Sequence, residues 1–149
     1  VHYDIKHIMR KIILCDIDGT IANNEHRQHF LEGKKDWDGF FSTLSNDLPM
    51  HEVINEVNNL HFNNNKNVIF ITGRPERYRA PTEEWLSKYF DFELHVFMRK
   101  DNDQRDKVTI KKEIFNSYFK SDDINCVYEN DDDLVALWES FGLKTIKIY

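Results

Sequence analysis

Apolar residues alternate between two patterns along this chain. In several stretches they recur three or four positions apart, which predicts amphipathic helices. The first helix begins at Asp47-Leu48-Pro49 with Asp47 as its N-cap, the second opens at Pro81 and Thr82, a third spans about 108–119, and the last ends at Gly142. Between the helices, short unbroken apolar runs predict buried strands. These runs lie at residues 12–15, 68–71, 94–98, 125–128 and 144–148.

This alternation predicts an α/β fold. Unbroken apolar strands joined by helices are typical of a parallel sheet that is covered on both faces. We therefore expect a three-layer, doubly wound, Rossmann-like domain with a five-stranded parallel sheet in the order 3-2-1-4-5. Residues 21–48 show no clean period and are too few for a domain of their own. For them we expect a loop with one amphipathic turn that packs on the sheet edge.

Length and composition narrow the protein class. The chain has 149 residues, so we expect one domain over residues 11–149, with residues 1–10 a leader or tail. We expect neither a membrane span nor a signal peptide. Cys15 and Cys126 fall inside predicted strands, which indicates buried thiols in a reducing, cytoplasmic setting and no disulfide framework. The net charge of −6 would repel nucleic acid, and only the middle segment, residues 74–112, is net basic.

Polar motifs follow the predicted strands. The first strand runs into Asp16-Ile17-Asp18-Gly19-Thr20, where two nearby carboxylates require a cation or a shared proton. Thr72-Gly73-Arg74-Pro75 follows the second strand, Lys111-Lys112 lies in the third helix, and Glu129-Asn130-Asp131-Asp132-Asp133 follows the fourth strand. Because the carboxyl ends of parallel strands meet at one edge of a sheet, we expect these motifs to form one site.

The order and placement of these motifs resembles the haloacid dehalogenase (HAD) superfamily of phosphotransferases over residues 11–149. More narrowly, the chain is similar to the phosphatase domain of phage and bacterial polynucleotide kinase-phosphatases. The further matching segments are His26-Arg27, residues 37–41 (WDGFF), residues 111–115 (KKEIF) and residues 135–138 (VALW). The resemblance implies a Mg²⁺-dependent phosphatase with a minimal cap or none, cytoplasmic or, for a phage protein, in the host cytoplasm.

The resemblance also implies residue roles. Asp16 would attack phosphorus and form an aspartyl-phosphate, and Asp18 would act as general acid and then as base. Thr72 and the Gly73 amide would bind phosphate oxygens, and a lysine would hold the developing charge. Among Lys107, Lys111 and Lys112, the family pattern points to Lys111. The full set of expected substrate-binding residues is Thr20, His26, Arg27, Gly73, Arg74, Arg99 and Arg105.

The expected metal ligands depart from the superfamily pattern. Mg²⁺ would be held by Asp16, the backbone carbonyl of Asp18 and a side chain of the fourth-strand motif. The superfamily places an aspartate pair at that motif, whereas this chain has Glu129-Asn130. An amide oxygen can bind Mg²⁺ but brings no charge, so we expect Asp131 or Asp133 to compensate as a direct or indirect ligand.

The substrate is left open by the sequence. A short insert after the first motif implies an open site that admits the end of a polymer. The arginines at 74, 77, 79, 99 and 105 either line an anion-binding rim or pair with nearby acidic residues. For Trp37 we expect core packing, with base stacking as the alternative.

Three hypotheses follow. The first is a phosphatase for nucleic-acid 3′ ends, the second a phosphatase for mononucleotides or other small phosphoesters, and the third a non-catalytic binding module. No phosphate-binding loop of the G-x-x-x-x-G-K-[ST] type is present, so a kinase activity would require a separate kinase or ligase partner chain. The oligomeric state is not predicted.

Overall fold

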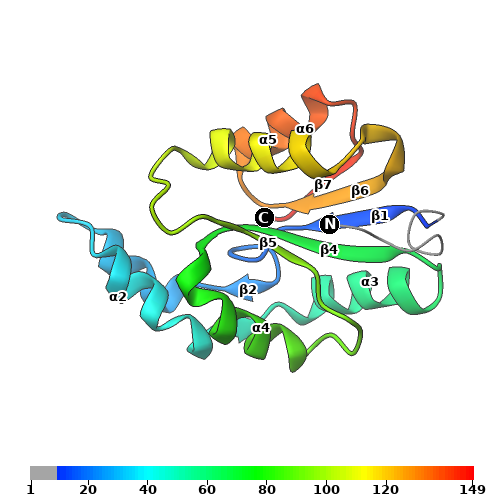
Figure 1. Ribbon diagram of the computed structural model, residues 1–149. Helices are drawn as coiled ribbons and strands as arrows, with labels where there is room; N and C mark the ends of the chain where they lie inside the picture. Colours follow the sequence, from blue (N-terminus) through cyan, green and yellow to red (C-terminus); the bar gives the residue numbers. More distant parts are fainter. Residues whose placement is uncertain (1–9) are drawn as a thin grey trace.

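The computed structural model describes residues 10–149 and is built on a five-stranded parallel sheet (Figure 1). Its strands are β1 (Ile12–Cys15), β4 (Asn67–Pro75), β5 (Val96–Arg99), β6 (Ile124–Glu129) and β7 (Thr145–Lys147). They lie in the order β5-β4-β1-β6-β7. Counted along the chain this is 3-2-1-4-5, so the predicted α/β topology with the first strand at the centre is confirmed. The leader or tail expected at residues 1–10 lies outside the described residues except for Arg10.

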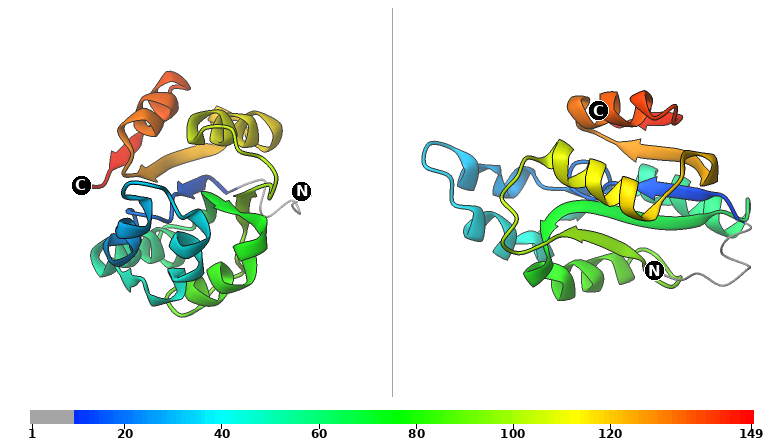
Figure 2. Two further views of the ribbon diagram at one scale, coloured as in Figure 1. Left: turned by 90° about the vertical axis from the view of Figure 1, so that its left-hand side faces the viewer. Right: turned by 45° about the horizontal axis from the view of Figure 1, so that its top comes forward.

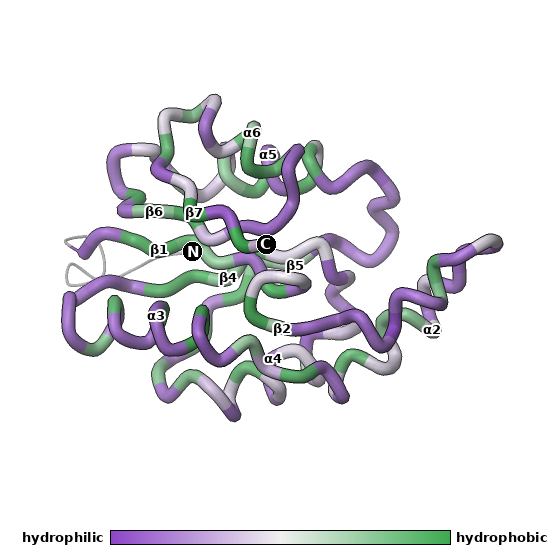
Figure 3. Tube along the Cα trace, turned by 180° about the vertical axis from the view of Figure 1, so that it is seen from behind, coloured by the Kyte–Doolittle hydropathy of each residue, from purple (hydrophilic) through white to green (hydrophobic). Residues whose placement is uncertain are grey.

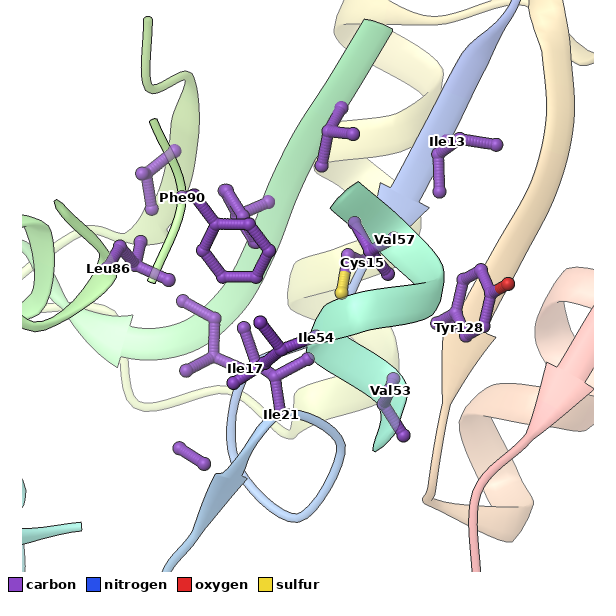
Figure 4. Close-up of a cluster of buried hydrophobic side chains, with 14 of the residues drawn as sticks. Ile13, Cys15, Ile17, Ile21, Val53, Ile54, Val57, Leu86, Phe90 and Tyr128 are labelled. Carbon is purple, nitrogen blue, oxygen red and sulfur yellow. The ribbon is translucent and has the colours of Figure 1, made fainter. Parts of the chain in front are cut away.

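Two pairs of helices cover the sheet. The helices α3 (His51–Phe62) and α4 (Arg79–Ser87) lie on one face, and α5 (Lys107–Tyr118) and α6 (Asp132–Ser140) on the other (Figures 1 and 2). Alternation along β1 supplies both cores: Ile13 and Cys15 join the cluster under α3 and α4, whereas Leu14 joins the cluster under α5 and α6. Figure 4 shows the first cluster, and Figure 3 shows hydrophobic residues along β1 and in the adjoining part of β4.

Some element boundaries differ from the prediction and bear on the site. The helix α3 begins at His51 with Met50 as its N-cap, so the prediction that Asp47 caps it is wrong. Strand β4 continues through residues 72–75 to pair with β5 at Arg99, and Glu129 is the last residue of β6. Glu129 is therefore held in the sheet by its pairing with Lys147, whereas residues 72–74 lie between the paired positions Ile71 and Pro75, where the register of β4 and β5 shifts.

The segment between β1 and α3 is more structured than the expected single turn. It leaves and returns through the short strands β2 (Ala22–Asn23) and β3 (Leu48–Pro49), which pair antiparallel, and it holds the 3₁₀ helix η1 (Glu25–Leu31) and the helix α2 (Trp37–Ser42). Asp36 caps α2 by accepting a hydrogen bond from the Gly39 amide at 2.9 Å. The segment projects past one end of the sheet, beside the loop that precedes α5 (Figure 1).

Two further sequence predictions concern membranes and thiols. Within residues 10–149, no helix combines the length and apolar character that crossing a bilayer demands. Cys15 and Cys126 are buried free thiols, as predicted.

Candidate active site

The polar motifs meet at the carboxyl ends of the central strands. Asp16 and Asp18 follow β1, Thr72 lies in β4, and Glu129 ends β6, while Lys111 reaches the same point from α5. The prediction that these motifs come together is confirmed by direct contacts between side chains that are as much as 110 residues apart in the sequence.

Asp16 is a buried carboxylate held from two sides. Its Oδ1 accepts a hydrogen bond from Lys111 Nζ at 2.7 Å, and its Oδ2 accepts one from Thr20 Oγ1 at 2.9 Å. Burial and the nearby Glu129 carboxylate raise the pKa of Asp16 to about 7, although Lys111 acts in the opposite direction. The arrangement fixes the orientation of a carboxylate that has little contact with water.

Lys111 bridges Asp16 and Glu129. It is 2% exposed, and its Nζ donates to Glu129 Oε1 at 3.2 Å as well as to Asp16. Burial alone lowers the pKa of Lys111, but the two carboxylates outweigh it and hold the pKa above its usual value. Lys107 pairs instead with Asp131, and Lys112 is exposed. Of the three lysines considered, only Lys111 reaches the carboxylates of the site.

Glu129 has a full set of protein partners. Besides Lys111, its Oε1 accepts from Trp138 Nε1 at 3.2 Å, and its Oε2 accepts from the backbone amides of Asn130 and Asp131. The carboxylate is 1% exposed. The Glu129 carboxylate therefore contacts Lys111 and the backbone amides at the start of α6. This arrangement suits a residue that positions Lys111.

Three oxygen-bearing groups converge beside Asp16. The inward atom of the Asn130 side-chain amide lies 2.9 Å from Asp16 Oδ2 and 3.0 Å from the backbone oxygen of Asp18. The orientation that satisfies its neighbours has the nitrogen inward, where it donates hydrogen bonds to both and to Thr20 Oγ1 at 3.2 Å. Turned by 180°, the amide would present its oxygen to the same point. Gly19 makes room for this contact, because a Cβ there would lie 2.3 Å from the Asn130 amide nitrogen, and its φ of +79° suits glycine.

These oxygens are a chemically suitable set for Mg²⁺. Oxygens bound at neighbouring octahedral positions about 2.1 Å from Mg²⁺ lie about 3 Å apart, close to the spacings found here. Within residues 10–149 no three His, Cys, Asp or Glu side chains form a metal-binding cluster. A metal at this site would therefore use one carboxylate, one amide oxygen and one backbone carbonyl, completed by water or substrate oxygens.

Asp18 is held by two buried arginines. Its carboxylate accepts from Arg74 at 2.8 and 3.1 Å and from Arg27 at 2.5 Å. Burial opposes ionisation, but Arg74 and Arg27 outweigh it and keep the pKa of Asp18 far below its usual value. Both arginines also contact Asp47, whose Oδ2 accepts from Arg27 at 2.6 Å and from Arg74 at 3.3 Å. Sequence reasoning missed Asp47 in this role, since contacts across 20 and 27 residues leave no local pattern.

Thr72 and Gly73 lie in β4 beside Asp18. The Thr72 hydroxyl is buried and accepts from the Arg74 amide at 3.2 Å, so its proton is available to another acceptor. Arg99 covers this turn of chain: its Nε donates to the Gly73 carbonyl at 3.0 Å and its Nη1 to the carbonyls of Asp103 and Arg105. A phosphate near Gly73 would meet the Arg99 guanidinium.

Several predicted substrate-binding residues have structural partners instead of open surfaces. Thr20, Arg27 and Arg74 are at most 1% exposed and contact Asp16, Asp18 or Asp47. His26 contacts Asp47 at 2.6 Å, and Arg105 pairs with Asp103 and Glu113 at 2.7 Å. The surface arginines 77 and 79 also pair with acidic neighbours, which matches the second of the two interpretations left open by the sequence.

A cleft of about 760 Å³ leads to this site. Asp18 and Gly73 line it near the strands, and Trp37 and Lys35 line it on the α2 side. The opposite wall is formed by Arg99 at the end of β5, by the loop before α5 and by Lys107, the first residue of α5. Trp37 is 47% exposed, so the expectation that it packs in the core is wrong.

Comparison with known proteins adds the following. The family model described as the polynucleotide kinase PNKP phosphatase domain matches residues 10–149. A protein of Autographa californica nuclear polyhedrosis virus, named "Putative bifunctional polynucleotide kinase/RNA ligase", is 27% identical over 138 residues, which are 91% of this chain and 19% of the viral protein.

Solved structures agree with this match. A chain of the Pnkp1/Rnl/Hen1 complex superposes with a TM-score of 0.75 and 29% identity, covering 93% of this chain and 45% of that one. The class C acid phosphatase from Bacillus anthracis, at 16% identity, shares the fold with a TM-score of 0.65, covering 94% of this chain and 66% of its own. The chain thus spans less than half of the viral protein and of the Pnkp1 complex chain that it matches.

Proposed function

This chain belongs to the family of polynucleotide kinase PNKP phosphatase domains, which are HAD-type hydrolases, and from that premise we propose that it removes the 3′-phosphate from nucleic-acid ends in a Mg²⁺-dependent reaction. The observation that carries the proposal is the buried Asp16 carboxylate, fixed by Lys111 at 2.7 Å and Thr20 at 2.9 Å, with Asp18 and Thr72 beside it. An oriented carboxylate next to a buried cation is what attack on a phosphate requires.

Asp16, Asn130 and the Asp18 carbonyl are the proposed Mg²⁺ ligands. Asp16 Oδ2 and the Asp18 carbonyl both lie against the Asn130 amide, which would present its oxygen to a metal after a 180° turn. The protein partners of Glu129 favour a role for that residue in positioning Lys111. When bound, Mg²⁺ would neutralise charge on the phosphate and on the attacking carboxylate.

Asp16 is the proposed nucleophile. One of its oxygens forms a bond to phosphorus while the bond between phosphorus and the sugar oxygen breaks, giving an aspartyl-phosphate and a sugar hydroxyl. The Lys111 ammonium, the Thr72 hydroxyl and the Gly73 amide hold the phosphoryl oxygens. Since Lys111 already touches Asp16, it lies where negative charge develops.

Asp18 is the proposed proton carrier. It gives its proton to the leaving sugar oxygen and then takes one from the water that attacks the aspartyl-phosphate, which regenerates Asp16 and releases inorganic phosphate. Arg27 and Arg74 favour its ionised form. Incoming phosphate charge acts in the other direction, because a neighbouring negative charge raises the pKa of a carboxyl group.

The substrate and partners are inferred from the relatives. The viral protein is named for polynucleotide kinase and RNA ligase activities, and the Pnkp1 structure is of a complex with Rnl and Hen1. We therefore propose that this chain acts alongside kinase or ligase activities on nucleic-acid ends. A mononucleotide phosphatase is the alternative, favoured by the net charge of −6.

A substrate panel tests the proposal. Phosphate release from 3′-phosphorylated oligonucleotides is compared with release from free 3′- and 5′-mononucleotides, with Mg²⁺ and with excess chelator. We expect the oligonucleotide to be preferred, with a steep dependence of kcat/KM on salt, and Asp16→Asn to abolish release. Preference for mononucleotides with a shallow salt dependence would select the alternative. If no phosphoester released phosphate, the proposal that this chain is a phosphatase would be refuted.

A further inference from the structure

The exposed indole of Trp37 stands out among the tryptophans of this protein. Trp85 and Trp138 are at most 2% exposed, whereas Trp37 is 47% exposed. Burying the apolar face of an aromatic side chain is favourable, so a large exposed ring at the mouth of a site is a candidate contact for a ligand.

The position of Trp37 is fixed by its neighbours. Its ring lies 5.9 Å from that of Phe40 and stacks on that of Phe41 at 6.0 Å between centroids. The helix that carries it is capped by Asp36, and Gly39 allows close packing, because a Cβ there would lie 2.5 Å from both Asp36 and Phe30. The Trp37 ring is therefore held in place before any ligand binds, which lowers the entropic cost of binding.

The cleft that holds Trp37 also contains the candidate active site. Asp18 and Gly73 line the same cavity, so a ligand with its phosphate at Gly73 can extend toward α2. Two positively charged side chains, Lys35 and Arg99, line the cleft between Gly73 and Trp37. Lys35 Nζ lies 5.7 Å from the Trp37 ring, and Arg99 contacts backbone carbonyls near Gly73. Neither has a carboxylate within salt-bridge distance among residues 10–149, in contrast to Arg105 and Lys107.

The two cations, Lys35 and Arg99, and the exposed ring of Trp37 are the kinds of group that bind the phosphates and bases of a nucleic-acid strand. Single strands bind to proteins through charged grooves that follow the phosphates and through aromatic rings that stack on bases. A base inside a duplex has both faces covered by its neighbours, so an exposed indole favours an unpaired one.

We propose that Trp37 stacks on an unpaired base of the strand whose phosphorylated end enters the site, with Lys35 beside a backbone phosphate of that strand and Arg99 beside its terminal phosphate. This inference rests on the proposed function and adds to it the substrate form, a single-stranded end. Trp37 is then a specificity residue that separates polynucleotides from mononucleotides.

Intrinsic fluorescence tests stacking without turnover. The three tryptophans include two buried ones, so ligand-dependent quenching reports on Trp37. An Asp16→Asn variant is titrated with a single-stranded 3′-phosphorylated oligonucleotide, and we expect saturable quenching that Trp37→Phe removes. We expect Trp37→Ala to weaken the affinity for the oligonucleotide about tenfold, within the range of one stacked base.

Kinetics give the second readout. The ratio of kcat/KM for the oligonucleotide to kcat/KM for a 3′-mononucleotide should fall about tenfold in Trp37→Ala. Phe62→Ala, which removes an exposed aromatic ring at the end of α3 that does not line the cleft, is the matched control and should leave the ratio unchanged.

The outcomes separate this inference from the proposed function. Turnover of the oligonucleotide without quenching, or an equal loss for both substrates in Trp37→Ala, would overturn the stacking role and leave the phosphatase intact. Quenching without turnover by the wild-type protein would support the stacking role and refute the phosphatase activity.

Discussion

Removing the Asp47 carboxylate should destabilise the protein far more than removing an acidic residue from its surface. Asp47 is 4% exposed and accepts hydrogen bonds from Arg27 at 2.6 and 2.7 Å and from Arg74 at 3.3 Å. In Asp47→Ala, two arginine charges remain buried with Asp18 as their only carboxylate among the residues that the structure describes.

The expected loss follows from the cost of an uncompensated buried charge. Removing one partner of a buried ion pair lowers the free energy of unfolding by about 3–5 kcal/mol. For a chain of this size each kcal/mol lowers Tm by about 2–4 °C, so we expect a decrease of about 6–20 °C. Since domains have a free energy of unfolding of about 5–15 kcal/mol, most of the variant should still fold.

Urea unfolding followed by circular dichroism measures this loss, with the change in midpoint read at constant m value. Asp38→Ala is the matched control, because Asp38 pairs with Arg77 at 3.2 Å on the surface, where a pair contributes about 1 kcal/mol or less. In a cycle with Arg27→Ala, the two losses should be strongly non-additive. Equal losses in Asp47→Ala and Asp38→Ala, or additive losses in the cycle, would refute the buried network as a source of stability.

Three further predictions concern the site and the core. Lys111→Met should lower kcat about 10²–10³-fold, because it removes the buried cation beside the reacting groups, while the exposed Lys112→Met on the same helix should not; equal activities would contradict the role of Lys111. Asn130→Asp should lower the half-saturating Mg²⁺ concentration about tenfold by adding a charged ligand, and an unchanged value would remove Asn130 from the metal site. Burial raises the pKa of Cys126 to about 11 and that of Cys15 well above its usual range, so a thiol reagent at pH 8 should label both slowly in the native protein and rapidly in denaturant; fast native labelling would disprove their burial.

Local patterns were sufficient for the fold. Unbroken apolar runs at β1, β4 and β6 predicted strands buried on both faces, and the connecting helices left few topologies to choose from. The prediction that Asp16 and Thr72 lie at the same sheet edge followed from chain direction alone, since parallel strands bring their carboxyl ends together.

Local patterns did not predict the partners of charged side chains that meet across the structure. Arg27 and Arg74 carry the signature of anion-binding residues, yet each is buried against Asp18 and Asp47. Asp47 itself precedes Leu48-Pro49, which is a reasonable helix start by capping rules, but its backbone turns into β3 first. Local sequence patterns do not predict which distant residue a charged side chain will pair with.

The sequence by itself determined the order of strands and helices and the motifs that form the candidate active site, because apolar periodicity and motif spacing are properties of neighbouring residues. Only the tertiary structure decided that Lys111 bridges Asp16 and Glu129, that the Asn130 amide meets Asp16 and the Asp18 carbonyl, and that Trp37 faces a cleft. Those outcomes depend on side-chain direction and on burial, which are fixed when elements far apart in the chain pack together and the free energy of each charge is set by its new neighbours.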